Sequence, residues 1–117
     1  MVSNSEQQLK KGSTQVLILA VLADGSAHGY AIAKQIRSRS DEALSMCEGA
    51  LYPALKDLED RGFVVSRWET AGSGPARKVY SITKAGSGEL NRQQQVWTSF
   101  ANAIDRIIGG RRDAEPA

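Results

Sequence analysis

The chain is poor in the residues that build covalent cross-links and metal sites. It contains one cysteine, Cys47, and one histidine, His28, in 117 residues. A single cysteine excludes an intramolecular disulfide and a metal site made of several cysteines. A single histidine cannot form a histidine-cluster metal site, and we expect it to pack or to cap a helix rather than to act in a catalytic triad. The sequence therefore predicts no metal and no cofactor.

Long apolar segments are also lacking. The opening stretch, MVSNSEQQLKKGST, has no apolar core of the signal-peptide type. The longest apolar run, VLILAVLA at 16–23, is much shorter than the roughly 20 residues that cross a bilayer. These absences predict a cytoplasmic protein without a membrane segment.

Sequence patterns of enzymes are missing as well. The segments GSGPA and GSAHG lack the lysine and hydroxyl residue that complete a phosphate-binding loop, and the scattered carboxylates form no evident acid–base pair. We therefore expect that the protein is not an enzyme. Cys47 is open to two interpretations: a redox-sensing thiol near a helix start, or a small core residue.

What the chain does contain is the composition of one globular domain. Hydrophobic residues make up 41% and charged residues 24% of it, which is not the profile of a disordered protein. The net charge of +2 identifies no partner, because nucleic-acid binding depends on where the cations lie.

Apolar spacing and capping residues predict four helices and one β-hairpin. Residues 1–12 are polar and are expected to form a flexible arm, and Ser13 or Thr14 is expected to cap a helix that carries the buried run 16–23. The other expected elements are a second helix at 28–40 with Tyr30, Ala33 and Ile36 on one side, a third helix within 48–62, strands at 63–69 and 77–83, a helix at 84–108 that Thr83 caps and Gly109-Gly110 ends, and a disordered tail at 111–117.

The third helix, EGALYPALKDLEDRG, has two dissimilar sides. Ser45 and Glu48 have the spacing of a capping box at its start. Pro53 fits near the first turn if the helix begins near Gly49 or Ala50, and a bend is expected if it begins at Met46. One side is predicted to face the core and carries Leu51, Ala54, Leu55 and Leu58, whereas the other carries Gly49, Tyr52, Pro53, Lys56 and Asp60.

This order of elements predicts a mainly α fold with a small β-hairpin wing. It is the order of a winged helix-turn-helix, here at 13–83, followed by a C-terminal dimerisation helix at 84–110. In that arrangement the N-terminal half of the third helix enters the DNA major groove and the wing lies beside it. Asp57, Glu59 and Asp60 then fall in the half that rises away from the phosphates.

Three segments of the chain resemble one known family. The segments HGYAIAKQI, GALYPALKDLEDRGFV and W…GPARKVYSITKAG are similar, in order and spacing, to the PadR family of winged-helix transcriptional regulators, over about residues 14–90. The resemblance implies a dimeric repressor of the shorter type, which binds an inverted-repeat operator and is released by a small molecule. Asp57 and Asp60 depart from the basic or neutral residues of many relatives, which limits how far DNA contact extends along the helix.

Several residues have the chemistry that DNA contact needs. Gly49 permits close approach, Tyr52 offers a hydroxyl and a flat ring, and Lys56 can meet a phosphate or a guanine edge. Tyr52 can equally be a packing residue. The basic residues of the second helix, of the wing and of Lys10-Lys11 are candidates for phosphates and the minor groove. The predicted DNA-binding residues are Lys34, Arg37, Ser45, Gly49, Tyr52, Pro53, Lys56, Arg67, Arg77 and Lys78.

The last helix has a broad apolar side that predicts a homodimer. A twofold dimer presents two reading helices, so double-stranded DNA with pseudo-palindromic half-sites about one helical turn apart is the expected partner. Trp97 and Phe100 have two interpretations: they stack on a small aromatic effector at the interface, or they pack in the dimer core. The predicted dimer or ligand residues are Leu90, Trp97, Phe100, Ala101, Ile104 and Ile108.

A second function from another class stays open. Some winged helices bind proteins instead of nucleic acid, so the alternative is a protein-interaction module that has lost its DNA surface.

Overall fold

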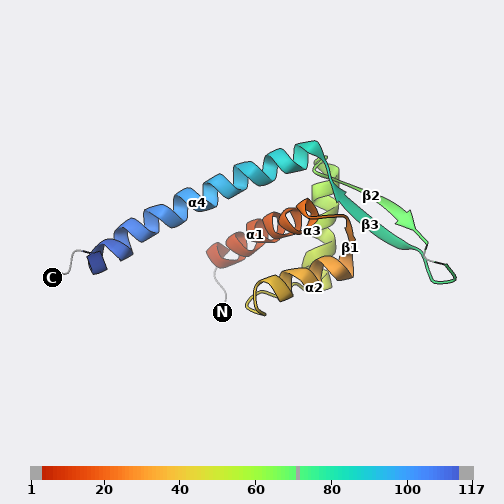
Figure 1. Ribbon diagram of the computed structural model, residues 1–117, viewed down its shortest axis with the longest axis horizontal. Coiled ribbons are helices and arrows are strands. Elements are labelled where there is room, and N and C mark those ends of the chain that lie inside the picture. Colours follow the sequence, from red (N-terminus) through yellow and green to blue (C-terminus); the bar gives the residue numbers. More distant parts are fainter. Residues whose placement is uncertain (1–3, 71, 114–117) are drawn as a thin grey trace.

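The computed structural model describes residues 4–70 and 72–113, and the side chains of residues 13–70 and 72–109. Its architecture is α+β, with helices packed on a small antiparallel sheet (Figure 1). The predicted fold class, mainly α with a β-hairpin wing, is therefore confirmed. The elements are α1 (Asn4–Ala23), β1 (Ala27–His28), α2 (Gly29–Arg39), α3 (Glu48–Asp60), β2 (Val64–Glu69), β3 (Arg77–Ile82) and α4 (Lys84–Asp113).

The sheet has three strands in the order β1-β3-β2. The predicted hairpin of β2 and β3 is present, with Val64 opposite Ile82 and Trp68 opposite Lys78. The two-residue strand β1 was not predicted, because so short a segment has no alternation to detect. Its pairing with β3 places His28 opposite Val79 and joins the start of α2 to the wing.

Both ends of the chain are more helical than predicted. Helix α1 begins at Asn4, so the predicted arm is wrong for residues 4–12, and Ser13 and Thr14 lie inside the helix instead of capping it. The segment EQQLKK consists of good helix formers, which explains the extension. Residues 1–3 lie outside the described part of the chain.

The end of α4 was also misplaced. The helix continues through Gly109-Gly110 to Asp113, so these glycines do not end it and residues 111–113 are not a tail. A glycine within a helix costs only about 1 kcal/mol relative to alanine, which a long helix tolerates. Residues 114–117 lie outside the described part of the chain.

The predicted capping box at the start of α3 is wrong. The N-cap is Cys47, whose side chain makes no capping hydrogen bond, and Glu48 is the first helical residue. Pro53 therefore lies inside the helix, beyond its first turn. Because proline has no N–H, the carbonyl of Gly49 receives no helical hydrogen bond from residue 53. Gly49 is exposed, so water can reach this carbonyl.

A single apolar core fixes the orientation of α3. Leu51, Leu55 and Leu58 are buried against α1, α2 and the sheet, as the predicted apolar stripe requires. At the start of α4, the Thr83 hydroxyl accepts the N–H of Gly86 at 3.0 Å and donates to the Gly62 carbonyl at 2.7 Å, so the predicted cap is confirmed.

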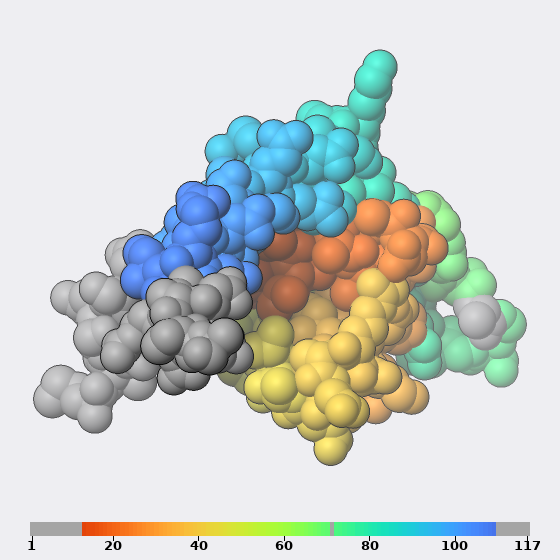
Figure 2. All heavy atoms as spheres, turned by 60° about the vertical axis from the view of Figure 1, so that its left-hand side comes forward, coloured from red at the N-terminus to blue at the C-terminus, as the bar shows by residue number. Residues whose placement is uncertain are grey.

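Helix α4 leaves the body of the molecule after its first turns. It extends well past the N-terminal end of α1, and the molecule measures 67 × 32 × 28 Å (Figure 1). In Figure 2, α4 runs along the upper side of the molecule in cyan and blue, and below it lie α1 in red to orange and α2 in orange to yellow. Among the residues described, no helix is long and apolar enough to cross a membrane.

Candidate nucleic-acid interface

The outward side of α3 carries the residues that the sequence assigned to it. Gly49, Tyr52, Pro53 and Lys56 are exposed, while the leucine stripe on the opposite side is buried. Tyr52 is 45% exposed, so it is neither a core residue nor fully free. Its ring lies against Gly29 at the start of α2, where the absence of a side chain makes room for it.

Two hollows meet at Tyr52. The smaller, of about 260 Å³, lies between α2 and the start of α3 and is lined by Lys34, Arg37 and Ser45. The larger, of about 620 Å³, lies between α2, α3 and the wing and is lined by Trp68, Arg77 and Lys78. Tyr30 and Tyr52 line both hollows, which makes them one continuous surface. We call Tyr30, Lys34, Arg37, Tyr52, Trp68, Arg77 and Lys78 the basic aromatic surface.

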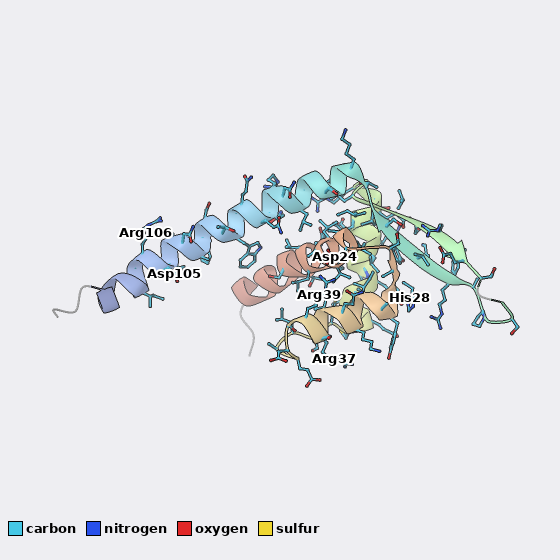
Figure 3. The ribbon with its side chains drawn as sticks, viewed as in Figure 1. Asp24, His28, Arg37, Arg39, Asp105 and Arg106 are labelled. Carbon is cyan, nitrogen blue, oxygen red and sulfur yellow. The ribbon has the colours of Figure 1, made fainter. Side chains whose placement is uncertain are left out.

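Three cations of the basic aromatic surface have no acidic partner. Within residues 13–70 and 72–109, Lys34, Arg37 and Arg77 make no ion pair, and Arg37 lies on the outer side of α2 (Figure 3). Lys78 lies 3.9 Å from Glu59. An exposed ion pair of this kind contributes about 0–1 kcal/mol and is easily exchanged for a phosphate. The surface therefore keeps its positive charge.

Two of the predicted basic DNA contacts with described side chains lie outside this surface. Lys56 is on α3 but lines neither hollow, and its Nζ is 3.5 Å from Asp60. Arg67 is held by Glu69 through two nitrogens, at 2.6 and 2.8 Å, and lines neither hollow. Lys10 and Lys11 lie where side chains are not described.

The acids of α3 have structural partners. Asp57 accepts a hydrogen bond from Gln15 of α1 at 2.7 Å and lies 3.6 Å from Arg61. Glu59 accepts the hydroxyl of Ser66 in β2 at 2.6 Å. Asp57 ties α3 to α1 and Glu59 ties it to the sheet, so the departure from the resembled family at Asp57 has a local role.

Sequence reasoning missed two aromatic residues of the surface. Tyr30 was placed on one side of the second helix together with Ala33 and Ile36 and was given no role in DNA contact, yet it is 70% exposed whereas Ile36 is buried. Trp68 was assigned no role and is 68% exposed. A signal for Trp68 was available, because the hairpin register places it directly opposite Lys78. Tyr80, which also lines the larger hollow, is buried, and this burial, with the nearby Glu59 carboxylate, raises the pKa of Tyr80.

Cys47 is exposed and lines the smaller hollow, so the interpretation as a core residue is wrong. The described residues contain no group of three or more histidine, cysteine or acidic side chains that could hold a metal ion.

Comparison with known proteins identifies the family to which the chain belongs. A model described as the transcriptional regulator PadR-like family matches residues 18–92. The chain belongs to this family. The resemblance that the three sequence segments carried is thereby confirmed.

Individual relatives match the chain over different shares of its length. The negative transcriptional regulator PadR of Bacillus subtilis is 32% identical over 74 residues, which are 63% of this chain and 41% of that protein. Transcriptional regulator Rv3488 of Mycobacterium tuberculosis is 28% identical over 105 residues, which are 90% of this chain and 92% of that protein. A transcriptional regulator from Clostridium thermocellum has a similar structure, with a TM-score of 0.77 at 28% identity over 85% of this chain and 96% of that one.

The PadR-family match ends at residue 92, and most of α4 lies beyond it. There Trp97, Phe100, Ile104 and Ile108 are exposed at helical spacing, together with Ala101, Val96 and Ile107. Leu90 was predicted to join this side, but it is 7% exposed and packs in the core of its own chain. The exposed apolar side therefore begins after Leu90.

Proposed function

We propose that this PadR-family regulator acts by binding DNA in a sequence-specific manner through the basic aromatic surface. The observation that carries the proposal is the convergence of Lys34, Arg37 and Arg77, three cations without an acidic partner in the described residues, around the exposed start of α3. Phosphates supply the missing negative charge, and release of their counterions supplies much of the affinity.

The geometry of α3 supports a reading role for its N-terminal half. Gly49 and Tyr52 are exposed near the start of the helix, where a major-groove helix meets base edges. Asp57 and Asp60 lie at the other end and have local partners. The wing places Arg77 and Lys78 beside the helix, within reach of the sugar-phosphate backbone or the minor groove.

The proposed active form is a homodimer joined through α4. The exposed apolar side of α4 supports this, because large side chains such as Phe100 stabilise an interface by about 1.5–3 kcal/mol each when buried. A twofold dimer would bind an inverted-repeat operator, and repression follows where the operator overlaps a promoter.

Release by a small aromatic effector completes the proposal. Trp97 and Phe100, both exposed on α4, supply the rings against which a planar molecule would stack at the interface. Addition of such an effector should quench Trp97 emission and lower operator affinity. A panel of planar aromatic compounds that changes neither property would contradict this part.

The test of the main proposal is selection of bound fragments from random DNA by the purified protein. The affinity for the selected site is then measured against salt concentration. We expect a steep loss of affinity with salt, and a slope reduced by about 1 for each phosphate contact removed, in Lys34→Ala, Arg37→Ala and Arg77→Ala. Arg106→Ala is the matched control, because it removes the same charge from α4, far from the surface (Figure 3).

The alternative is a winged-helix module that binds a protein. The two functions predict opposite outcomes of the selection. An enriched inverted repeat with a steep salt slope supports the DNA-binding regulator. The protein-interaction module would be favoured if no sequence is enriched and the dependence of affinity on salt is shallow. In that case Arg106→Ala and Arg77→Ala should change this dependence alike.

A further inference from the structure

His28 connects the sheet, α2 and the wing. It is the last residue of β1 and the N-cap of α2, and its Nδ1 accepts the backbone N–H of Ala31 at 3.3 Å. Its other ring nitrogen, Nε2, lies 3.1 Å from Nη1 of Arg77 on β3. Figure 3 labels His28 where the chain passes from the sheet into α2.

The imidazole cannot accept both hydrogen bonds. A neutral histidine has one nitrogen that accepts and one that donates. The Ala31 N–H is partly buried in the first turn of α2, where no carbonyl of the helix can reach it. The Arg77 guanidinium is exposed and can donate to water instead. Nδ1 therefore accepts from Ala31, and Nε2 carries the hydrogen.

Two donors consequently face each other. The Nε2 atom of His28 and the Nη1 atom of Arg77 are 3.1 Å apart, and with this tautomer each of them carries a hydrogen. Arg77 has no carboxylate within 4.0 Å in the described part of the chain, because Glu69, its neighbour across the hairpin, is bonded to Arg67. One acceptor oxygen placed between the two donors would satisfy both.

We propose that His28 and Arg77 together bind one phosphate of the DNA backbone, with the imidazole donating from Nε2. The shared chemistry is that of a phosphate oxyanion, and its source is the DNA, because both residues line the larger hollow of the basic aromatic surface. The inference rests on the proposed function and adds one DNA contact to it. A count of charged residues does not identify this contact, because His28 is counted as neutral.

The first test separates the helix cap from the donor. Asparagine is a favoured N-cap, so His28→Asn keeps an acceptor for Ala31 and removes the Nε2–H. We expect an unchanged melting temperature and an operator affinity about tenfold lower. Arg77→Ala should also lower the affinity, and the double variant should lose less than the product of the two single effects.

A control variant comes from the same hairpin. Arg67→Ala removes the same charge from β2, but Arg67 is bonded to Glu69 and does not approach His28. The double variant of Arg67→Ala with His28→Asn should therefore lose operator affinity by the product of the two single losses. The double variant of Arg77→Ala with His28→Asn should lose less than that product.

The second test locates the phosphate. Operators are made with a neutral methylphosphonate at one backbone position at a time. At one position per half-site the wild-type protein should lose affinity. His28→Asn should lose less there, and the double variant of His28→Asn with Arg77→Ala should lose little. The Nε2–H resonance of His28 should move when operator is added at a concentration equal to that of the protein, and inorganic phosphate at the same concentration should leave it in place.

The outcomes distinguish the two proposals. If the wild-type protein binds the operator with a steep salt slope but His28→Asn binds equally well, the inference is overturned and the proposed function stands. A ring resonance that moves with inorganic phosphate and not with operator also overturns it. If no DNA is bound at all, the proposed function itself fails.

Discussion

The ring of Tyr52 on α3 lies directly against Gly29 at the start of α2. The Tyr52 hydroxyl oxygen is 2.6 Å from the position that a Cβ on residue 29 would take. A residue with a side chain at this position would force the ring to move. Because Tyr52 lines both hollows of the basic aromatic surface, the shape of that surface depends on this glycine.

Gly29→Ala should therefore weaken DNA binding more than folding. The displaced atoms are the end of an exposed ring that can rotate away, and alanine favours a helix over glycine by up to about 1 kcal/mol. We expect a melting temperature equal to or above that of the wild type, and an operator affinity close to that of Tyr52→Ala. Thermal unfolding and fluorescence anisotropy check the two parts. A variant with wild-type affinity would show that the position of Tyr52 does not matter.

Gly86 should respond in the opposite way. A Cβ there would overlap the carbonyl oxygen of Phe63 and come within 2.8 Å of Ile82, and a backbone atom cannot rotate away. We expect Gly86→Ala to destabilise the protein by about 3 kcal/mol, as strong overpacking does. Gly88→Ala, two residues later, meets nothing within 4 Å. This control should instead gain about 0.5–1 kcal/mol, so urea unfolding of the two variants decides the point.

The buried side of α3 could be predicted from the sequence because it depends on local spacing. Leu51, Leu55 and Leu58 recur at helical intervals, and the core accepts them at those positions. The exposed side of α2 could not be predicted in the same way. Tyr30 has the apolar character of a core residue, and only the packing of α3 against α2 leaves it outside.

Glu89 provides a prediction for stability against pH. Its carboxylate accepts hydrogen bonds from Arg92 at 2.8 and 3.0 Å and from Gln93 at 2.9 Å. These bonds, that of Arg92 first, lower the pKa of Glu89 from 4.5 to about 2. The group therefore stabilises the fold above pH 4.5, where the unfolded carboxyl is also charged. That contribution is lost as the pH falls from 4.5 to about 2.

Urea unfolding of Glu89→Gln at several pH values tests this. The difference in free energy of unfolding between wild type and variant should be constant above about pH 5.5 and shrink as the pH falls toward 2. Arg92→Gln should show the same trend, since it removes the other partner. A difference that stays constant down to pH 2.5 would contradict the assignment.

Which cations of the candidate site are paired could not be predicted from composition. The sequence treats Arg67 and Arg77 alike, as two wing arginines. The hairpin register then places Glu69 opposite Arg77, yet the carboxylate bonds Arg67 and leaves Arg77 beside His28. Whether Glu69 pairs with Arg67 or with Arg77 depends on the side-chain conformations of Arg67 and Glu69, two residues apart on β2. Sequence periodicity does not predict these conformations.

The exposed side of α4 leads to the last prediction. Phe100 is 59% exposed and packs in no core cluster of the described chain. Phe100→Glu should therefore leave the melting temperature of the monomer unchanged while it removes two phenyl rings from each dimer. At about 1.5–3 kcal/mol for each ring, the dissociation constant of the dimer should rise at least about a hundredfold. Asn102→Glu adds the same charge to the opposite side of α4 and should stay dimeric. Light scattering coupled to gel filtration compares them, and a Phe100→Glu protein that remains dimeric would place the interface on another surface.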